Sequence, residues 1–195
     1  MLPARYLILV KHSQPALEPE VPASQWHLSA EGERRCGPLA EALTPYAPAT
    51  VVTSAEAKAR QTAALIAPRL NLPWHIAPGL HEHDRTGVGW LPEGELEQRV
   101  AAFFAQPDEL VFGKETAAAA RLRFQAAVGD VLAQTPEGTV VIVTHGTVLT
   151  LFAAAHAGLA PLPLWQRLGL PSFVVFSLPA LTLVTVVEAV EARDA

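Results

Sequence analysis

The stretch Thr139-Val-Val-Ile-Val-Thr-His-Gly146 is the clearest strand in the sequence, and it stops at a histidine and a glycine. A short, continuous apolar run is typical of a strand that is buried on both faces of a parallel sheet. The run Tyr6-Leu-Ile-Leu-Val10 has the same character and is followed by Lys11, His12 and Ser13. Two strands of the predicted sheet therefore end next to a histidine.

Further elements alternate along the chain on either side of these two strands. Shorter strands are predicted at 50–53, 74–77, 173–177 and 181–187, and Pro179-Ala180 is short enough to join the last two as a hairpin. Helices are predicted near 31–43, 55–67, 95–105, 116–134 and 147–157, with Ser29 as the N-cap of the first and Pro68 ending the second. This alternation predicts a three-layer α/β/α sandwich with a mostly parallel central sheet.

The length and composition suit one compact domain. The chain has 195 residues, of which half are hydrophobic, and no linker divides it. Residues 81–94 show no clean period and contain three glycines, so we expect a cap or loop region near 81–115 within a single domain that spans 1–195.

Charge and cysteine content narrow the class of protein. The net charge of -5, without a basic block, argues against a nucleic-acid partner. The single cysteine, Cys36, permits no internal disulfide and fits a reducing compartment. No signal peptide is evident, and the long apolar stretch 140–165 is interrupted by His145 and His156, so we expect a cytoplasmic protein without a membrane partner. The sequence predicts no oligomeric state.

The carboxyl edge of the predicted sheet is where the chemistry is expected, since ligands of open α/β sheets bind there. Lys11, His12 and His145 lie at this edge, and Lys58 follows in the first turns of a helix. Helix N-termini and cations suit a phosphate dianion. Glu82 follows the third strand. A charged carboxylate beside a phosphate is electrostatically unfavourable, so Glu82 is expected to carry a proton there and could act as a general acid.

These residues resemble the ordered motifs of the histidine phosphatase superfamily, also called the phosphoglycerate mutase-like family. The resemblance covers most of the chain, and the motifs follow one another in the same order as in the family. The motifs are Lys11-His12-Ser13 for Arg-His-Gly, Leu28-Ser-Ala-Glu-Gly32 for Leu-Thr-x-x-Gly, Thr53-Ser-Ala-Glu-Ala-Lys-Ala-Arg-Gln-Thr-Ala63 for Ser-Ser-Pro-Leu-x-Arg-Ala-x-Gln-Thr-Ala, Glu82 after the third strand, Glu115-Thr116 with Arg123, and Ile142-Val-Thr-His-Gly146 for Val-x-x-His-Gly.

The resemblance implies a phosphomonoester hydrolase that acts through a phosphohistidine. His12 would be the nucleophile, Glu82 the proton donor and then the base that activates water, and His145 a further catalytic group. Lys11, Lys58 and His145 would neutralise charge on the transferring oxygens. The expected phosphate contacts are completed by Ser13, Gly146 and Arg85. The substrate would be a small phosphorylated molecule, and the mechanism needs no metal or other cofactor.

Departures from the family pattern keep two alternatives open. Both family arginines are lysines here, Lys11 and Lys58, which keeps the charge but loses the bidentate fork. Ser13 also replaces a glycine. The chain is therefore alternatively a weak or inactive member that binds a phosphorylated ligand. A phosphoglycerate-type mutase is the second alternative, although the short chain favours hydrolysis.

Two further interpretations concern residues 81–83. The sequence His81-Glu82-His83 could chelate a metal, but no second ligand pair has convincing spacing, so no metal site is predicted. His83 is expected either at the mouth of the site or in contact with substrate. For Arg123, the family resemblance implies a structural role.

Overall fold

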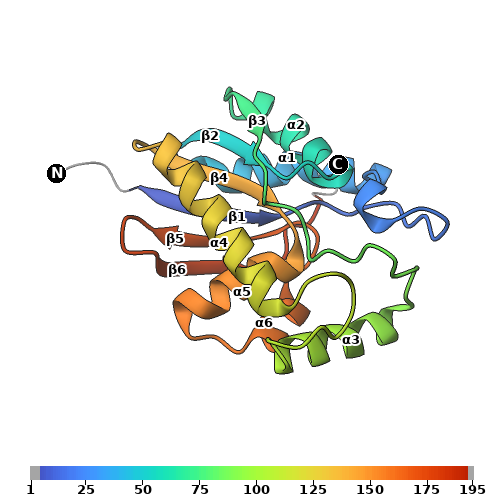
Figure 1. The fold of residues 1–195 in the computed structure, drawn as a ribbon. Coiled ribbons are helices and arrows are strands. Elements are labelled where there is room, and N and C mark those ends of the chain that lie inside the picture. The colour runs from blue at the N-terminus through green and yellow to red at the C-terminus, as the bar shows by residue number, and fades with distance from the viewer. Residues whose placement is uncertain (1–4, 193–195) are drawn as a thin grey trace.

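A six-stranded sheet with the order β3-β2-β4-β1-β5-β6 is the centre of the fold (Figure 1). The computed structural model describes residues 5–192. The strands are β1 Tyr6–Lys11, β2 Pro48–Thr53, β3 Trp74–Ile76, β4 Thr139–Thr144, β5 Ser172–Ser177 and β6 Thr182–Val187. The pairings of β1 with β4, β4 with β2 and β2 with β3 are parallel, and only those that involve β5 are antiparallel among these strands. The mostly parallel sheet is confirmed.

Helices cover both faces of this sheet and make the three layers. The helices are α1 Ala30–Leu43, α2 Ala57–Arg69, α3 Glu93–Ala105, α4 Ala117–Gln134, α5 Gly146–Ala157 and α6 Pro161–Arg167, with 3-10 turns at Ala23–Gln25 and Thr44–Tyr46. One apolar core lies between the sheet and α1 and α2, and the other lies between the sheet and α3 to α6. The predicted α/β/α sandwich is therefore confirmed.

Local sequence explains where the main helices begin. Ser29 is the N-cap of α1, and its side chain accepts a hydrogen bond from the Gly32 amide at 3.0 Å, as the sequence predicts. Thr116 caps α4 in the same way through the Ala119 amide at 3.1 Å. Each cap satisfies an amide that has no partner within its own helix.

Two helix predictions need correction. Helix α2 does not stop before Pro68 but ends at Arg69, so Pro68 lies in its last turn. The proline lacks the N–H that would continue the hydrogen-bond pattern, and the helix ends within one residue of it. The sequence analysis also missed α6. Pro161 stands at its first position, where a missing N–H and a fixed φ favour helix initiation, so the sequence does contain a signal for this helix. The hairpin between β5 and β6 is confirmed.

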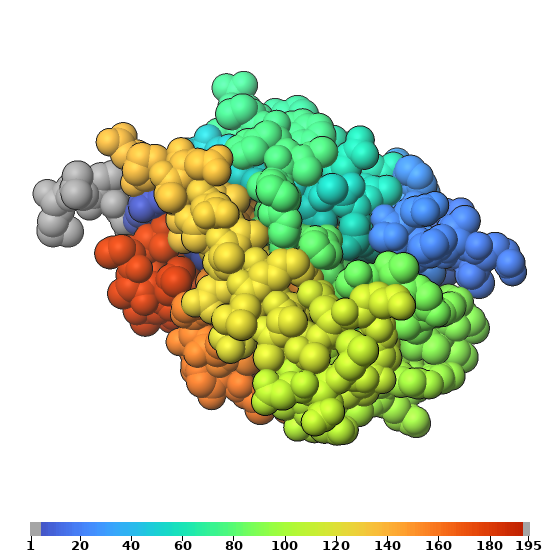
Figure 2. Space-filling model, viewed as in Figure 1, coloured from blue at the N-terminus to red at the C-terminus, as the bar shows by residue number. Residues whose placement is uncertain are grey.

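The carboxyl ends of β1, β2 and β4 lie at one edge of the sheet, where the loop after β3 also begins. The early loop around 15–27 and the segment that follows β3 lie at this same end of the molecule (Figure 2). Residues 81–92 contain no helix or strand, as predicted for a loop, and α3 begins only at Glu93.

Two further features bear on the sequence analysis. Cys36 on α1 is fully buried in the core between α1, α2 and the sheet. Within residues 5–192, no helix has the length and apolarity that crossing a membrane would require.

Candidate active site

His12 directly follows β1 and is held in one orientation. Its backbone amide donates to the Thr144 carbonyl at 3.0 Å, which continues the pairing of β1 with β4. Its ring Nδ1 lies 2.8 Å from the Ser13 carbonyl oxygen, so Nδ1 carries the proton and donates. Burial, with smaller effects of His145 and Lys58, lowers the pKa of His12 well below its usual value. The ring is therefore neutral, and its Nε2 keeps a lone pair.

His145 stands at the end of β4, where it is the N-cap of α5. Its ring centroid lies 5.2 Å from that of His12, with the planes crossing at 63°. Its Nε2 lies 2.9 Å from the Ser54 hydroxyl, whereas its buried Nδ1 has no hydrogen-bond partner among the described residues. Burial lowers the pKa of His145 to about 4, so this ring is also neutral at rest.

Glu82 lies after β3 and is bound by the N-terminus of α5. Its two oxygens accept hydrogen bonds from the amides of Thr147 at 3.0 Å, Val148 at 3.2 Å and His83 at 2.9 Å. Burial raises the pKa of this carboxyl, but the Arg85 charge, His145 and the amides outweigh burial and hold the pKa at about 2. Glu82 is at the expected edge of the sheet, but it is ionised at rest rather than protonated.

Lys11 also reaches the site, but its ammonium group already has a partner. Its Nζ donates to the Leu168 carbonyl at 2.5 Å. Burial is the main cause that lowers the pKa of Lys11 to about 8; Glu82 opposes this shift and Arg85 adds to it. The lysine chain packs against Gly146, where an added Cβ would lie 3.1 Å from Lys11 Cε. A glycine at the start of α5 thus leaves room for Lys11.

Lys58 meets a carboxylate that the sequence analysis did not select. Lys58 Nζ donates to the Ala23 carbonyl at 2.6 Å and to Glu56 Oε2 at 2.7 Å. The other oxygen of Glu56 accepts from the Glu82 amide at 2.9 Å and lies 3.5 Å from His145 Nε2. The only signal in the sequence is an acidic residue between β2 and α2, and its direction depends on a loop conformation that no motif fixes.

Arg85 lies at the site as expected. Its Nη2 donates to the Thr147 hydroxyl at 3.0 Å and lies 3.9 Å from Glu82 Oε2, while its guanidinium carbon is 5.6 Å from the centre of the Phe112 ring. The guanidinium group therefore adds a third cation beside the two lysines at this edge of the sheet.

Ser13 is not brought into this group, in contrast to the expectation. The residue is fully buried, its hydroxyl donates to the Gly32 carbonyl at 2.7 Å, and its amide donates to the Thr62 hydroxyl at 3.0 Å. Both of its donors are therefore used to attach α1 and α2 next to His12. Because α1 packs closely here, the Gly32 carbonyl takes up the Ser13 hydroxyl.

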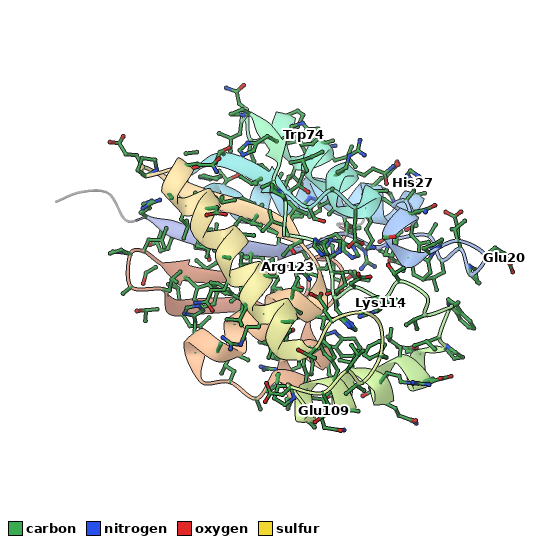
Figure 3. All side chains as sticks on the ribbon, in the orientation of Figure 1. Glu20, His27, Trp74, Glu109, Lys114 and Arg123 are labelled. Carbon is green, nitrogen blue, oxygen red and sulfur yellow. The ribbon has the colours of Figure 1, made fainter. Side chains whose placement is uncertain are left out.

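Arg123 lies on α4 (Figure 3) and positions the loop that carries Glu82. Its guanidinium donates to the carbonyls of Gly79 at 2.8 Å, His81 at 3.0 Å and Glu82 at 3.2 Å, and it pairs with Glu115 at 2.5 Å. These contacts give Arg123 the structural role that the sequence analysis expected.

His83 is not at the mouth of the site. It is 2 % exposed, and its ring packs 4.1 Å from that of Phe103 and 4.6 Å from that of Phe112. Successive residues of this extended segment point in different directions, so Glu82 reaches the site while His83 fills the core. Within residues 5–192, no group of three or more histidine, cysteine, aspartate or glutamate side chains is arranged to hold a metal ion.

The site thus gathers two neutral histidines, His12 and His145, with two carboxylates and three cations. This set can receive a phosphoryl group at His12 Nε2 and can move a proton at Glu82.

A family model and several solved structures match this chain. A family model described as the histidine phosphatase superfamily, branch 1, matches residues 7–178. YhfR of Bacillus stearothermophilus superposes with a TM-score of 0.75 at 22% identity, covering 95% of this chain and 96% of that chain. A mycobacterial glucosyl-3-phosphoglycerate phosphatase gives 0.71 at 21% identity, with 90% and 91% covered.

A third solved structure is more distant in sequence but has the same fold. A mutant of phosphoserine phosphatase from Entamoeba histolytica, in complex with phosphoserine, gives a TM-score of 0.75 at 16% identity, with 93% of this chain and 96% of that chain covered. A search of curated protein sequences finds no match.

Proposed function

Because the chain belongs to the histidine phosphatase superfamily, branch 1, we propose that it hydrolyses small phosphomonoesters through a phosphohistidine on His12. The observation that carries the proposal is the neutral His12 ring, whose Nδ1 donates to the Ser13 carbonyl at 2.8 Å and whose Nε2 is therefore a nucleophile. The proposal includes a cytoplasmic location, in keeping with the single buried thiol of Cys36.

In the first half of the proposed reaction, His12 Nε2 attacks phosphorus and the bond to the leaving oxygen breaks. Lys11, Lys58 and Arg85 supply positive charge where the transferring oxygens develop negative charge. Glu82 is ionised at rest, so it must gain a proton when the dianionic substrate binds. A nearby negative charge raises the pKa of a carboxyl, and the protonated Glu82 then donates to the leaving oxygen.

In the second half, the same carboxylate acts as a base. Glu82 removes a proton from a water molecule, the water oxygen bonds to phosphorus, and the bond between phosphorus and His12 Nε2 breaks. Orthophosphate leaves, and Glu82 releases the proton that it took from water to solvent once the negative charge beside it is gone. No step in this sequence requires a metal ion or an organic cofactor.

A weak or inactive phosphate binder is the second candidate function, and one observation favours it. Both lysines already have internal partners, since Lys58 pairs with Glu56 and Lys11 donates to the Leu168 carbonyl. A substrate must replace these contacts before the lysines can neutralise a transferring phosphoryl group.

The experiment that separates the two functions is metal-free hydrolysis of an aryl phosphate, with chelator present, by the wild type, His12→Ala and Glu82→Gln. His75→Ala is the matched control, because His75 is an exposed histidine on β3. We expect turnover that His12→Ala abolishes, that Glu82→Gln lowers by about a hundredfold or more, and that His75→Ala leaves unchanged. An acid-labile phosphoryl label should be trapped on the wild type and not on His12→Ala.

Equal rates for the wild type and His12→Ala, with an aryl phosphate and with a panel of natural phosphoesters, would exclude the phosphatase proposal. Binding of inorganic phosphate by such a protein would then support the second candidate.

A further inference from the structure

Glu56 is a buried carboxylate beside the catalytic histidines that the proposed reaction does not use. Its side chain is 11% exposed, and its two oxygens face different groups. Oε2 pairs with Lys58, whereas Oε1 accepts from the Glu82 amide and lies 3.5 Å from His145 Nε2. A negative charge placed beside a phosphate site weakens the binding of a dianion unless it has a compensating role.

The two nitrogens of the His145 ring have different surroundings. Nε2 lies against the Ser54 hydroxyl and Glu56, so Nδ1 is the nitrogen left to contact a ligand. If Nε2 donates to Ser54 or Glu56 in the neutral ring, Nδ1 carries only a lone pair. Such a nitrogen repels a phosphoryl oxygen and becomes a donor only when the ring holds two protons.

We propose that Glu56 is a positioning residue that lets His145 take up a proton when a phosphoryl dianion binds, so that His145 Nδ1–H donates to a phosphoryl oxygen. The proton comes from solvent on binding and returns to solvent on release of orthophosphate, and it is separate from the proton that Glu82 gains. This inference rests on the proposed function, because it places the phosphoryl group between His12 and His145.

The charges around His145 support this role. Burial keeps the ring neutral at rest; Glu56 and Glu82 favour the charged ring, whereas Lys58 and His81 disfavour it. The neutral His12 ring lies beside it, with its centroid 5.2 Å away. Glu82 already receives three amides and lies near Arg85, while Glu56 Oε1 receives one amide. A bound dianion adds negative charge on the Nδ1 side of the His145 ring, and Glu56 supplies negative charge on the Nε2 side. Both charges favour the protonated ring.

The test uses tungstate, a tetrahedral dianion that does not itself titrate near neutral pH, and counts the protons taken up on binding. Calorimetry in two buffers of different ionisation enthalpy gives this count. We expect the wild type and Glu56→Asp to take up about one proton more per bound tungstate than Glu56→Gln, and any proton gained by Glu82 is common to all three. Glu109→Gln removes an exposed carboxylate and is the control that should match the wild type.

A second measurement identifies the group that is protonated. In protein labelled with ¹⁵N-histidine, the His145 ring nitrogens of the tungstate complex should have the shifts of an imidazolium in the wild type and of a neutral ring in Glu56→Gln. A neutral ring in the wild-type complex, or an imidazolium in both proteins, overturns the inference. A neutral ring in the wild-type complex overturns the inference even if Glu56→Gln does not fold.

The two proposals fail separately in these experiments. The tungstate measurements need no turnover, so a protein without phosphatase activity can still show the coupling between Glu56 and His145. A protein whose turnover depends on His12 but whose His145 stays neutral retains the proposed function and loses this inference.

Discussion

At the scale of single residues, burial decides the protonation of the groups that would transfer the phosphoryl group. His12 and His145 are 6% and 0% exposed, and burial is the main cause of the lowered pKa of each ring. The same effect acts on Lys11, where it disfavours the charge that phosphate binding needs. A lysine in this position is therefore sensitive to pH in a way that an arginine is not.

The first prediction concerns this sensitivity. Because the pKa of Lys11 is lowered to about 8, the ammonium group is charged below that pH and neutral above it. We expect kcat/KM, which reports the free enzyme, to fall as the pH rises through about 8. Lys11→Arg should keep its charge and move this fall to higher pH. An unchanged alkaline limb in Lys11→Arg would contradict the assignment.

The second prediction concerns the contribution of Glu82 to stability. Its folded-state pKa is depressed from 4.5 to about 2, so its stabilising effect is fully present above about pH 4.5 and is lost as the pH falls toward 2. We expect Glu82→Gln to lower the free energy of unfolding at neutral pH by about 1–2 kcal/mol, since the charge at the helix N-terminus is lost.

Urea denaturation of both proteins at several pH values measures this difference. The gap between the wild type and Glu82→Gln should narrow as the pH is lowered below about 4.5. A gap that stays constant with pH would show that the carboxylate charge does not stabilise α5.

How far the sequence predicts the site depends on how each residue is positioned. His12, His145 and Glu82 follow strands, and the parallel sheet brings strand ends together whatever the loops do. Glu56 lies in a short loop between β2 and α2, and its direction is set by contacts with Lys58 and with the Glu82 amide that the sequence alone does not reveal. The Ser13 hydroxyl donates to the Gly32 carbonyl, a partner on another element that the sequence does not reveal.

At the scale of the elements, α1 closely approaches the segment that follows β1 and carries His12. A Cβ at Gly32 would lie 2.0 Å from the Gln14 carbonyl oxygen, which is backbone and cannot turn aside. The Ser29 amide also donates to this carbonyl at 3.0 Å. The glycine therefore allows α1 to pack directly behind Ser13 and His12.

The third prediction follows from this contact. Gly32→Ala should lower the free energy of unfolding by about 2–4 kcal/mol, because the backbone of α1 or of the nucleophile segment must shift. Gly129→Ala is the matched control, since Gly129 is an exposed glycine within α4 with open space around it. That change should instead stabilise the helix by about 0.5–1 kcal/mol. Equal effects in thermal or urea denaturation would contradict the packing argument.

Element by element, periodicity predicts the strongly amphipathic or fully buried segments and misses those that depend on their neighbours. β4 is buried along its whole length and is evident in the sequence. Helix α6 has only seven residues, too few to show a period, and packs against α3 and α5. Its existence depends on those contacts more than on its own pattern.

At the scale of the whole molecule, both apolar cores rest on the same central strands. β1 and β4 send alternate side chains into each core, with Leu7 and Leu9 on one face and Ile8 and Val10 on the other. Neither layer of helices can separate from the sheet without exposing a face of these strands.

The fourth prediction is that the chain unfolds as one cooperative unit, including the region 81–115 for which the sequence predicts a cap. Denaturation followed by far-ultraviolet circular dichroism and by tryptophan fluorescence should give one coincident transition. The fluorescence reports several regions, since Trp26, Trp74, Trp90 and Trp165 are spread along the chain. Two separated transitions would show that the region unfolds as an independent unit.

Because Cys36 is fully buried, the chemical labelling of its thiol can report local opening of the fold. The thiol is fully inaccessible, its Sγ lies 3.3 Å from the Gly32 carbonyl oxygen that also receives Ser13, and burial raises its pKa to about 11. An alkylating reagent can reach it only when α1 lifts from the sheet, so the rate of labelling measures how often the support behind the nucleophile comes apart. A ligand that slows this labelling would do so by holding the folded state, without any need for turnover or an added probe.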